Sequence, residues 1–143
     1  MKFVDLDLNK SYTYADYLTW KFTETLELIR GKIFKMSPAP SAYHQMISTK
    51  LLSRIAYFLG NGSCQVFHAP FDVRLPLPPE RSKDEEVTTV IQPDLSVICD
   101  PEKIDIRGCL GPPDWIIEIL SPGTAQKDMN PNFAVYEHPR VRG

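Results

Sequence analysis

The longest segment with helical periodicity in this sequence runs from Ser41 to Leu59. Ser41 can cap its first turn through the side-chain hydroxyl, and Gly60-Asn61-Gly62 ends the run. Apolar residues recur at intervals of three and four, namely Ile47, Leu51, Leu52, Ile55, Phe58 and Leu59. Because an amphipathic helix must bury its apolar side, we expect a sheet packed against this helix.

Most of the remaining chain consists of short apolar runs that are typical of β-strands. Segments 25–29 and 32–36 predict a hairpin, because Arg30-Gly31 between them supplies a turn. A short helix capped by Thr13 is expected to run through Trp20. Further strands are expected at 64–68, 71–75, 87–91, 94–99 and 115–120. One long helix among short strands predicts a single α+β domain over residues 1–143, with a mixed, curved sheet packed against the helix.

Composition excludes several classes of protein. The 143 residues carry 16 Lys and Arg against 18 Asp and Glu, a formal net charge of −2. This balance disfavours a protein that lives permanently on nucleic acid, but it leaves transient contact with DNA open. No stretch approaches the roughly 18 consecutive apolar residues of a membrane span, and residues 1–7 lack a signal-peptide core, so we expect no membrane contact and a cytoplasmic location.

The cysteines fit that location. Cys64, Cys99 and Cys109 form an odd set without a CxxC pair, and two of them lie in apolar runs. We expect all three to be reduced, with packing rather than catalysis as their role.

Two carboxylates stand at positions that an ordinary surface role does not explain well. Glu118 lies inside the apolar run 115–120, which predicts a strand buried on both faces, where an unpaired carboxylate would cost several kcal/mol. Its partner could be a buried Arg or Lys, a proton or a divalent metal ion. Asp94 follows Pro93 and opens the strand 94–99, where an Asx-type turn residue is the simplest interpretation.

The connection between these strands bears on both acids. Residues 100–114 include Gly108, Gly111, Pro112 and Pro113, so the two strands can form an antiparallel pair. Asp94 would then lie near Glu118 or Leu120. Opposite or diagonal residues of such a pair lie about 4.5–8 Å apart at Cβ, close enough for two carboxylates to share one Mg²⁺.

These residues also carry a resemblance. Asp94 after a proline, followed by a hydrophobic strand and Ile117-Glu118-Ile119-Leu120-Ser121-Pro122, resembles the active-site signature of PD-(D/E)XK nucleases. The match extends from about Tyr12 to Tyr136 and is similar to the Uma-two family of restriction endonuclease-like proteins. The motifs that carry it are Leu26-Glu27-Leu28-Ile29-Arg30-Gly31-Lys32-Ile33, Met36-Ser37-Pro38, His44, Ala69-Pro70-Phe71-Asp72-Val73-Arg74-Leu75, Gln92-Pro93-Asp94-Leu95-Ser96-Val97 and Gly111-Pro112-Pro113-Asp114.

The resemblance implies a restriction-endonuclease-like fold and a site for Mg²⁺ or Mn²⁺. Asp94 and Glu118 match the metal-binding acids, and the carbonyl of Ile119 would complete the oxygen shell. Glu27 matches an additional acid of the family, although spacing alone predicts an outward-facing strand residue. His44 matches a recurrent family histidine that would contact substrate, although by itself it predicts a helix-surface residue.

The implied reaction is hydrolysis of phosphodiester bonds in DNA, with a lysine assisting the attacking water. Leu120 occupies the position of the motif's lysine, and Asn132 occupies the position that carries a lysine in relatives, so Lys127 is the nearest replacement. The alternative is a catalytically inactive nuclease-fold module with a binding or regulatory role. Because relatives continue past the segment that ends at Tyr136, we expect missing C-terminal elements, an exposed strand edge and a homo-oligomer.

Overall fold

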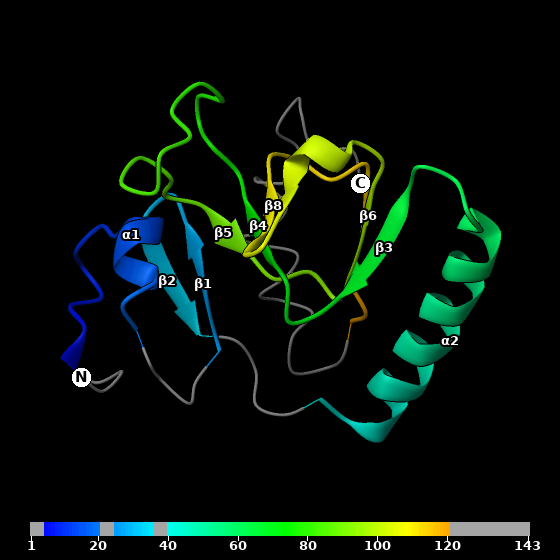
Figure 1. The fold of residues 1–143 in the computed structure, drawn as a ribbon. Helices are drawn as coiled ribbons and strands as arrows, with labels where there is room; N and C mark the ends of the chain where they lie inside the picture. The colour runs from blue at the N-terminus through cyan, green and yellow to red at the C-terminus, as the bar shows by residue number, and fades with distance from the viewer. Residues whose placement is uncertain (1–4, 21–24, 36–39, 121–143) are drawn as a thin grey trace.

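The computed structural model describes residues 5–20, 25–35 and 40–120, and these form an α+β fold (Figure 1). The α+β class and the mixed sheet that the sequence predicts are confirmed, although the strands divide between two sheets rather than one. None of the helices in these ranges has the length and apolar character needed to cross a bilayer. The elements are α1 (Tyr14–Tyr17), β1 (Leu26–Ile29), β2 (Lys32–Lys35), α2 (Ala42–Leu59), β3 (Gln65–His68), β4 (Asp72–Arg74), β5 (Val90–Ile91), β6 (Leu95–Ile98), the 3₁₀ helix η2 (Pro101–Lys103), β7 (Ile104–Asp105), β8 (Gly108–Leu110) and β9 (Trp115–Ile117).

The predicted hairpin is confirmed as β1 and β2. Arg30 and Gly31 form its two-residue turn, with φ of 51° and 84°, which is the left-handed conformation that matches the twist of paired strands. β1 also pairs with β5, so it lies inside the six-stranded sheet, whose order is β2-β1-β5-β4-β8-β7. All four residues of β1 are buried.

The parallel pairing of β4 with β8 makes this sheet mixed. Sequence patterns predict only a connection over residues 100–114, and that prediction is wrong for β7 and β8. Both strands are short, and β8 begins at Gly108 with φ of 139°, a conformation that side chains rarely adopt. A Cβ at Gly108 would overlap the main-chain carbonyl of Asp72, so the close approach of β4 and β8 depends on this glycine.

The second sheet, in the order β3-β6-β9, carries the long helix. Figure 1 shows α2 beside β3, on the far side from the β1–β2 hairpin. Side chains on the inner face of α2 pack with residues of β3, β6 and β9, and those on the helix are Leu51, Leu52, Ile55 and Leu59. The predicted packing is therefore confirmed, but Ile47 and Phe58 point outward and are 48% and 87% exposed.

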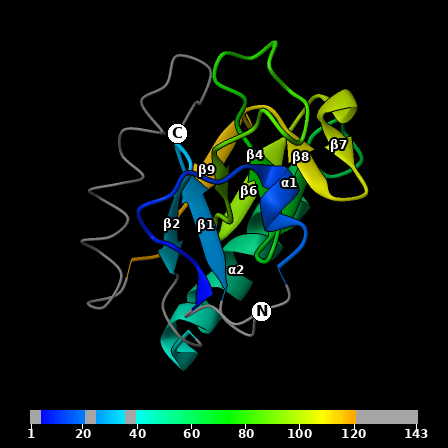
Figure 2. The same ribbon diagram turned by 90° about the vertical axis from the view of Figure 1, so that its left-hand side faces the viewer.

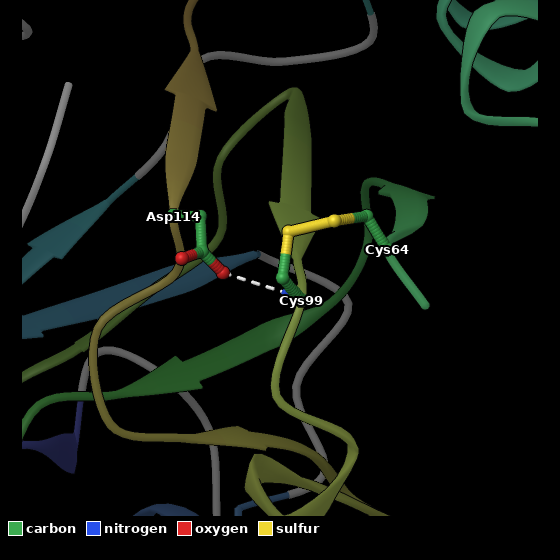
Figure 3. Close-up of a disulfide and its surroundings, with 3 residues drawn as sticks. All are labelled: Cys64, Cys99 and Asp114. Atoms are coloured by element: carbon green, nitrogen blue, oxygen red, sulfur yellow. Dashed lines mark hydrogen bonds between the residues drawn. A yellow bond between two sulfur atoms is a disulfide. The ribbon is translucent and has the colours of Figure 1, made fainter. Parts of the chain in front are cut away.

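Cys64 and Cys99 form a disulfide that joins the beginning of β3 to the end of β6 (Figure 3). The expectation that all three cysteines are reduced is wrong for this pair. β3 and β6 are antiparallel with Gln65 opposite Ile98, so the next position along brings the two cysteines face to face, with Cα atoms 3.9 Å apart. Cys109 is free and buried, and burial raises the pKa of its thiol to about 12.

Candidate functional site

Asp94 lies where the chain passes from one sheet to the other. Gln92, Pro93 and Asp94 connect β5 of the six-stranded sheet to β6 of the three-stranded sheet. The main-chain carbonyl of Asp94 accepts a hydrogen bond from Ala69 N (3.0 Å), which attaches this crossing to the segment after β3. The position of Asp94 is therefore set by both sheets.

Each oxygen of the Asp94 carboxylate has a partner from a different element. His44 Nε2 lies 3.2 Å from Oδ1, and Ile119 N donates to Oδ2 at 2.7 Å. His44 occupies the first turn of α2, where Ser41 Oγ accepts a hydrogen bond from its main-chain N. The His44 and Asp94 side chains are only 16% and 18% exposed, so the expectation of an ordinary helix-surface histidine is wrong. The contact places His44 at the predicted site.

Glu118 follows directly after β9 and is partly buried. The predicted antiparallel pairing is confirmed: β6 and β9 pair with Leu95 opposite Ile117, and one further step along this register leads to Asp94 and Glu118. The expectation of a strand buried on both faces is wrong, because Trp115 is 46% exposed and Ile117 is only partly buried. Among the described strands, β9 pairs with β6 alone. The pairing of β6 with β9, and not complete burial of β9, therefore brings Glu118 close to Asp94.

Glu27 is almost completely buried, with 1% of its surface exposed, so it is not the outward-facing residue that strand spacing predicts. β1 lies between β2 and β5 in the sheet, and its side chains are buried on both faces. Glu27 Oε2 accepts a hydrogen bond from the main-chain N of Gln92 at 2.8 Å. Gln92 is two residues from Asp94, a reach of at most about 7 Å of extended chain, so Glu27 lies beside the same crossing.

A partly buried polar network, which the sequence patterns do not predict, adjoins this crossing. Gln92 Nε2 donates to Asp72 Oδ1 and to the Tyr17 hydroxyl, both at 2.9 Å. The Tyr17 and Tyr14 hydroxyls each donate to a carboxylate oxygen of Asp72 at 3.1 Å. Burial and then the negative charge of Asp72 raise the pKa of both phenols far above the usual value, so they act as hydrogen-bond donors.

The available signal for this network was an acid between two apolar residues, Phe71 and Val73, in a predicted strand. Asp72 has the same type of context that drew attention to Glu118. Its partners Tyr14 and Tyr17 come from α1, whose predicted cap is confirmed by reciprocal hydrogen bonds between Thr13 and Asp16.

Two further predictions concern the C-terminal segment and the metal ion. Lys127 and Asn132, like the predicted C-terminal edge, lie outside the described residues. Across residues 5–20, 25–35 and 40–120, no three His, Cys, Asp or Glu side chains gather closely enough to hold a metal ion. Asp94, Glu118 and Glu27 carry carboxylate oxygens, which Mg²⁺ and Mn²⁺ prefer, so these residue types fit such a cation. The groups in contact with the Asp94 carboxylate are His44 Nε2 and Ile119 N.

Comparisons with known proteins support the fold. A crystal structure of a putative nuclease belonging to DUF820 from Anabaena variabilis superposes with a TM-score of 0.63 at 24% identity, over 86% of this chain and 66% of that one. This similarity establishes a shared fold. The uncharacterized protein slr1290 of Synechocystis is 26% identical over 125 residues, which cover 86% of this chain. The chain spans 60% of the length of that relative.

The family match covers most of the sequence. Residues 14–143 match the Uma2 family, whose description is "Putative restriction endonuclease". These residues include α1, both sheets, α2 and the crossing that carries Asp94. The chain therefore belongs to the Uma2 family, in agreement with the resemblance carried by its motifs.

Proposed function

We propose that this protein is an endonuclease that hydrolyses phosphodiester bonds in DNA with the help of Mg²⁺ or Mn²⁺. The observation that carries the proposal is the setting of the Asp94 carboxylate, held between His44 on α2 and the main chain of Ile119. Glu27 and Glu118 approach the same crossing from β1 and from the end of β9. Three acids from three different strands or strand ends are thereby directed to one region of the fold.

The cation would be held by Asp94, Glu118 and the carbonyl of Ile119, with Glu27 as a further acid. Each Asp94 oxygen has one partner in the structure and can accept a second interaction, so these hydrogen bonds do not exclude a cation. When bound, a divalent cation supplies an acidified water molecule and neutralises charge that develops on the phosphate.

The proposal also gives roles to three side chains other than the two metal-binding acids. His44 donates to Asp94 Oδ1 through Nε2–H and so holds the carboxylate in one orientation; it is also the residue that we propose contacts the phosphate of the substrate. Lys127 is proposed to orient the attacking water in place of the lysine that Leu120 replaces. Glu27 accepts a hydrogen bond from the main-chain N of Gln92, two residues before Asp94, and so is linked to Asp94 through the main chain.

The second candidate function is a catalytically inactive binding or regulatory module. One observation favours it: Leu120, at the position of the motif's lysine, has a hydrocarbon side chain that cannot orient water. In either case DNA is the proposed partner, contacted transiently, and the chain is proposed to form homo-oligomers in the cytoplasm.

Cleavage of plasmid DNA by the purified protein separates the two functions. We expect nicking or linearisation with Mg²⁺ or Mn²⁺, none with EDTA, and a rate at least about 100-fold lower in Asp94→Asn and Glu118→Gln. Glu102→Gln is the matched control, because Glu102 is an exposed acid on η2, away from the crossing, and should retain full activity. A folded protein that cuts with neither cation would establish the inactive module, and cleavage that persists in Asp94→Asn would refute the proposed site.

A further inference from the structure

The outward-facing side of α2 is unusually apolar. Five of the ten large apolar side chains that are exposed among the described residues belong to this one helix, and they are Tyr43, Met46, Ile47, Tyr57 and Phe58. Tyr57 and Phe58 are 90% and 87% exposed. A concentration of exposed apolar side chains on one element is typical of a binding surface.

The same side of the helix is also positively charged. At 3.6 residues per turn, Tyr43, Ile47, Lys50, Arg54 and Tyr57 fall within about 80° of one another, and we call these five residues the outer stripe of α2. Lys50 and Arg54 are both exposed. The sequence of α2, AYHQMISTKLLSRIAYFL, contains no Asp or Glu, whereas the whole chain has a net charge of −2. The helix therefore carries a formal charge of +2, although the whole chain is net negative.

Charge decides between the partners that an apolar helix face could take. A second copy docked through the same outer stripe would bring two pairs of cations together without an acid between them, which is unfavourable. A polyanion complements Lys50 and Arg54, and exposed tyrosine rings are suited to stack on bases or pack on sugars. These features together are typical of a nucleic-acid surface rather than of a helix–helix interface.

We propose that the outer stripe of α2 binds the sugar–phosphate backbone of DNA. Lys50 and Arg54 contact phosphates, and the rings of Tyr43 and Tyr57 pack on deoxyribose and on unpaired bases. The proposal rests on the proposed nuclease function, because the same helix carries His44, which contacts Asp94. Lys50 follows His44 by six residues, which is about 9 Å along the helix axis and about 120° around it, so a strand bound to the outer stripe must pass around the beginning of α2 to reach the candidate site.

Fluorescence anisotropy with labelled duplex and single-stranded oligonucleotides in EDTA tests the surface without cleavage. We expect Lys50→Ala/Arg54→Ala to weaken binding about tenfold or more at low salt, and the slope of log K against log salt to fall by about 2, because two phosphate contacts are lost. Arg81→Ala/Lys83→Ala removes the same charge from the exposed β4–β5 loop, which lies away from α2 in Figures 1 and 2, and should change binding by less than twofold.

Tyr57→Ala tests the role of the aromatic rings. We expect it to weaken binding of the single strand at least about fivefold and of the duplex less, since only unpaired bases can stack on the ring. All substitutions lie on exposed positions, and thermal melting by circular dichroism confirms that each variant is folded.

Several results would overturn the proposal. They are the absence of DNA binding by the parent protein at low salt, equal losses in the two double variants, an unchanged salt slope, and a Tyr57→Ala protein that binds both oligonucleotides normally. DNA binding that depends on Lys50 and Arg54, without cleavage in Mg²⁺ or Mn²⁺, would support the surface while refuting the nuclease. Cleavage that does not change with the α2 substitutions would support the nuclease and refute the surface.

Discussion

Asp72 is the residue whose removal we expect to damage the fold most without touching the candidate site directly. Its carboxylate accepts three hydrogen bonds, from the Tyr14 and Tyr17 hydroxyls and from Gln92 Nε2. A hydrogen bond to a charged group contributes about 1.5–3 kcal/mol, so three would sum to about 4.5–9 kcal/mol. Tyr17 and Gln92 keep their mutual hydrogen bond, and water can reach a partly buried position, so we expect Asp72→Ala to lower the unfolding free energy by about 3–5 kcal/mol.

Urea unfolding, followed by tryptophan fluorescence and circular dichroism, measures this loss. Asp84→Ala is the matched control: Asp84 forms an exposed ion pair with Arg107, so its removal should cost less than about 1 kcal/mol. A double-mutant cycle of Asp72→Asn with Tyr17→Phe should give a coupling energy of about 1 kcal/mol or more. A loss below about 1 kcal/mol in Asp72→Ala, or no coupling in the cycle, would refute the reasoning.

Three further outcomes follow from the fold. Because a Cβ at Gly108 would overlap the β4 backbone and φ there is 139°, Gly108→Ala should cost about 2 kcal/mol or more in urea unfolding, and a smaller loss would contradict the close strand approach. Reduction with dithiothreitol should lower stability by about 2–4 kcal/mol, since Cys64 and Cys99 are 35 residues apart, and Cys64→Ser/Cys99→Ser should be insensitive to the reductant. The raised phenol pKa values of Tyr14 and Tyr17 mean that their contribution is complete below pH 10 and falls above it, by up to about 1.4 kcal/mol per pH unit for each phenol; stability that stays constant from pH 9 to pH 11 would contradict this.

The sequence predicted α2 and the β1–β2 hairpin, because residues next to these elements in the chain determine where they begin, turn or end. Ser41 and the glycines after Leu59 define α2 within one residue at its start, and Arg30-Gly31 defines the hairpin turn. The inner face of α2 also follows from helical spacing, but the pattern could not assign Ile47 and Phe58, because the side that meets a sheet depends on where that sheet lies.

Features that depend on distant pairing were missed for a common reason. β7 and β8 have two and three residues, too few to show a periodicity, and β8 is stabilised by its parallel pairing with β4. The Cys64–Cys99 disulfide follows from the register of β3 against β6, which no local pattern contains. The same holds for Asp72, whose two tyrosine partners are more than 50 residues away in α1.

The candidate site was easier to predict where acids interrupt apolar runs. Asp94 drew attention through its place at a strand entrance, and the antiparallel pairing of its strand with β9 is confirmed. Glu27 looked like a surface residue because Leu26-Glu27-Leu28 alternates in polarity, which is typical of a strand with one covered face, whereas all four residues of β1 are buried. Only the position of β1 between two other strands shows that it is buried.

Residues 92–94, between β5 and β6, connect the two sheets covalently. Glu27 belongs to the six-stranded sheet and Asp94 opens the three-stranded one, so any rotation of one sheet against the other changes the separation of these two acids. The hydrogen bond from Gln92 N to Glu27 limits that rotation, because only Pro93 stands between Gln92 and Asp94 and its ring fixes φ. The separation of the two acids therefore depends on the angle between the sheets, and the contact of His44 with Asp94 couples the position of α2 to that separation.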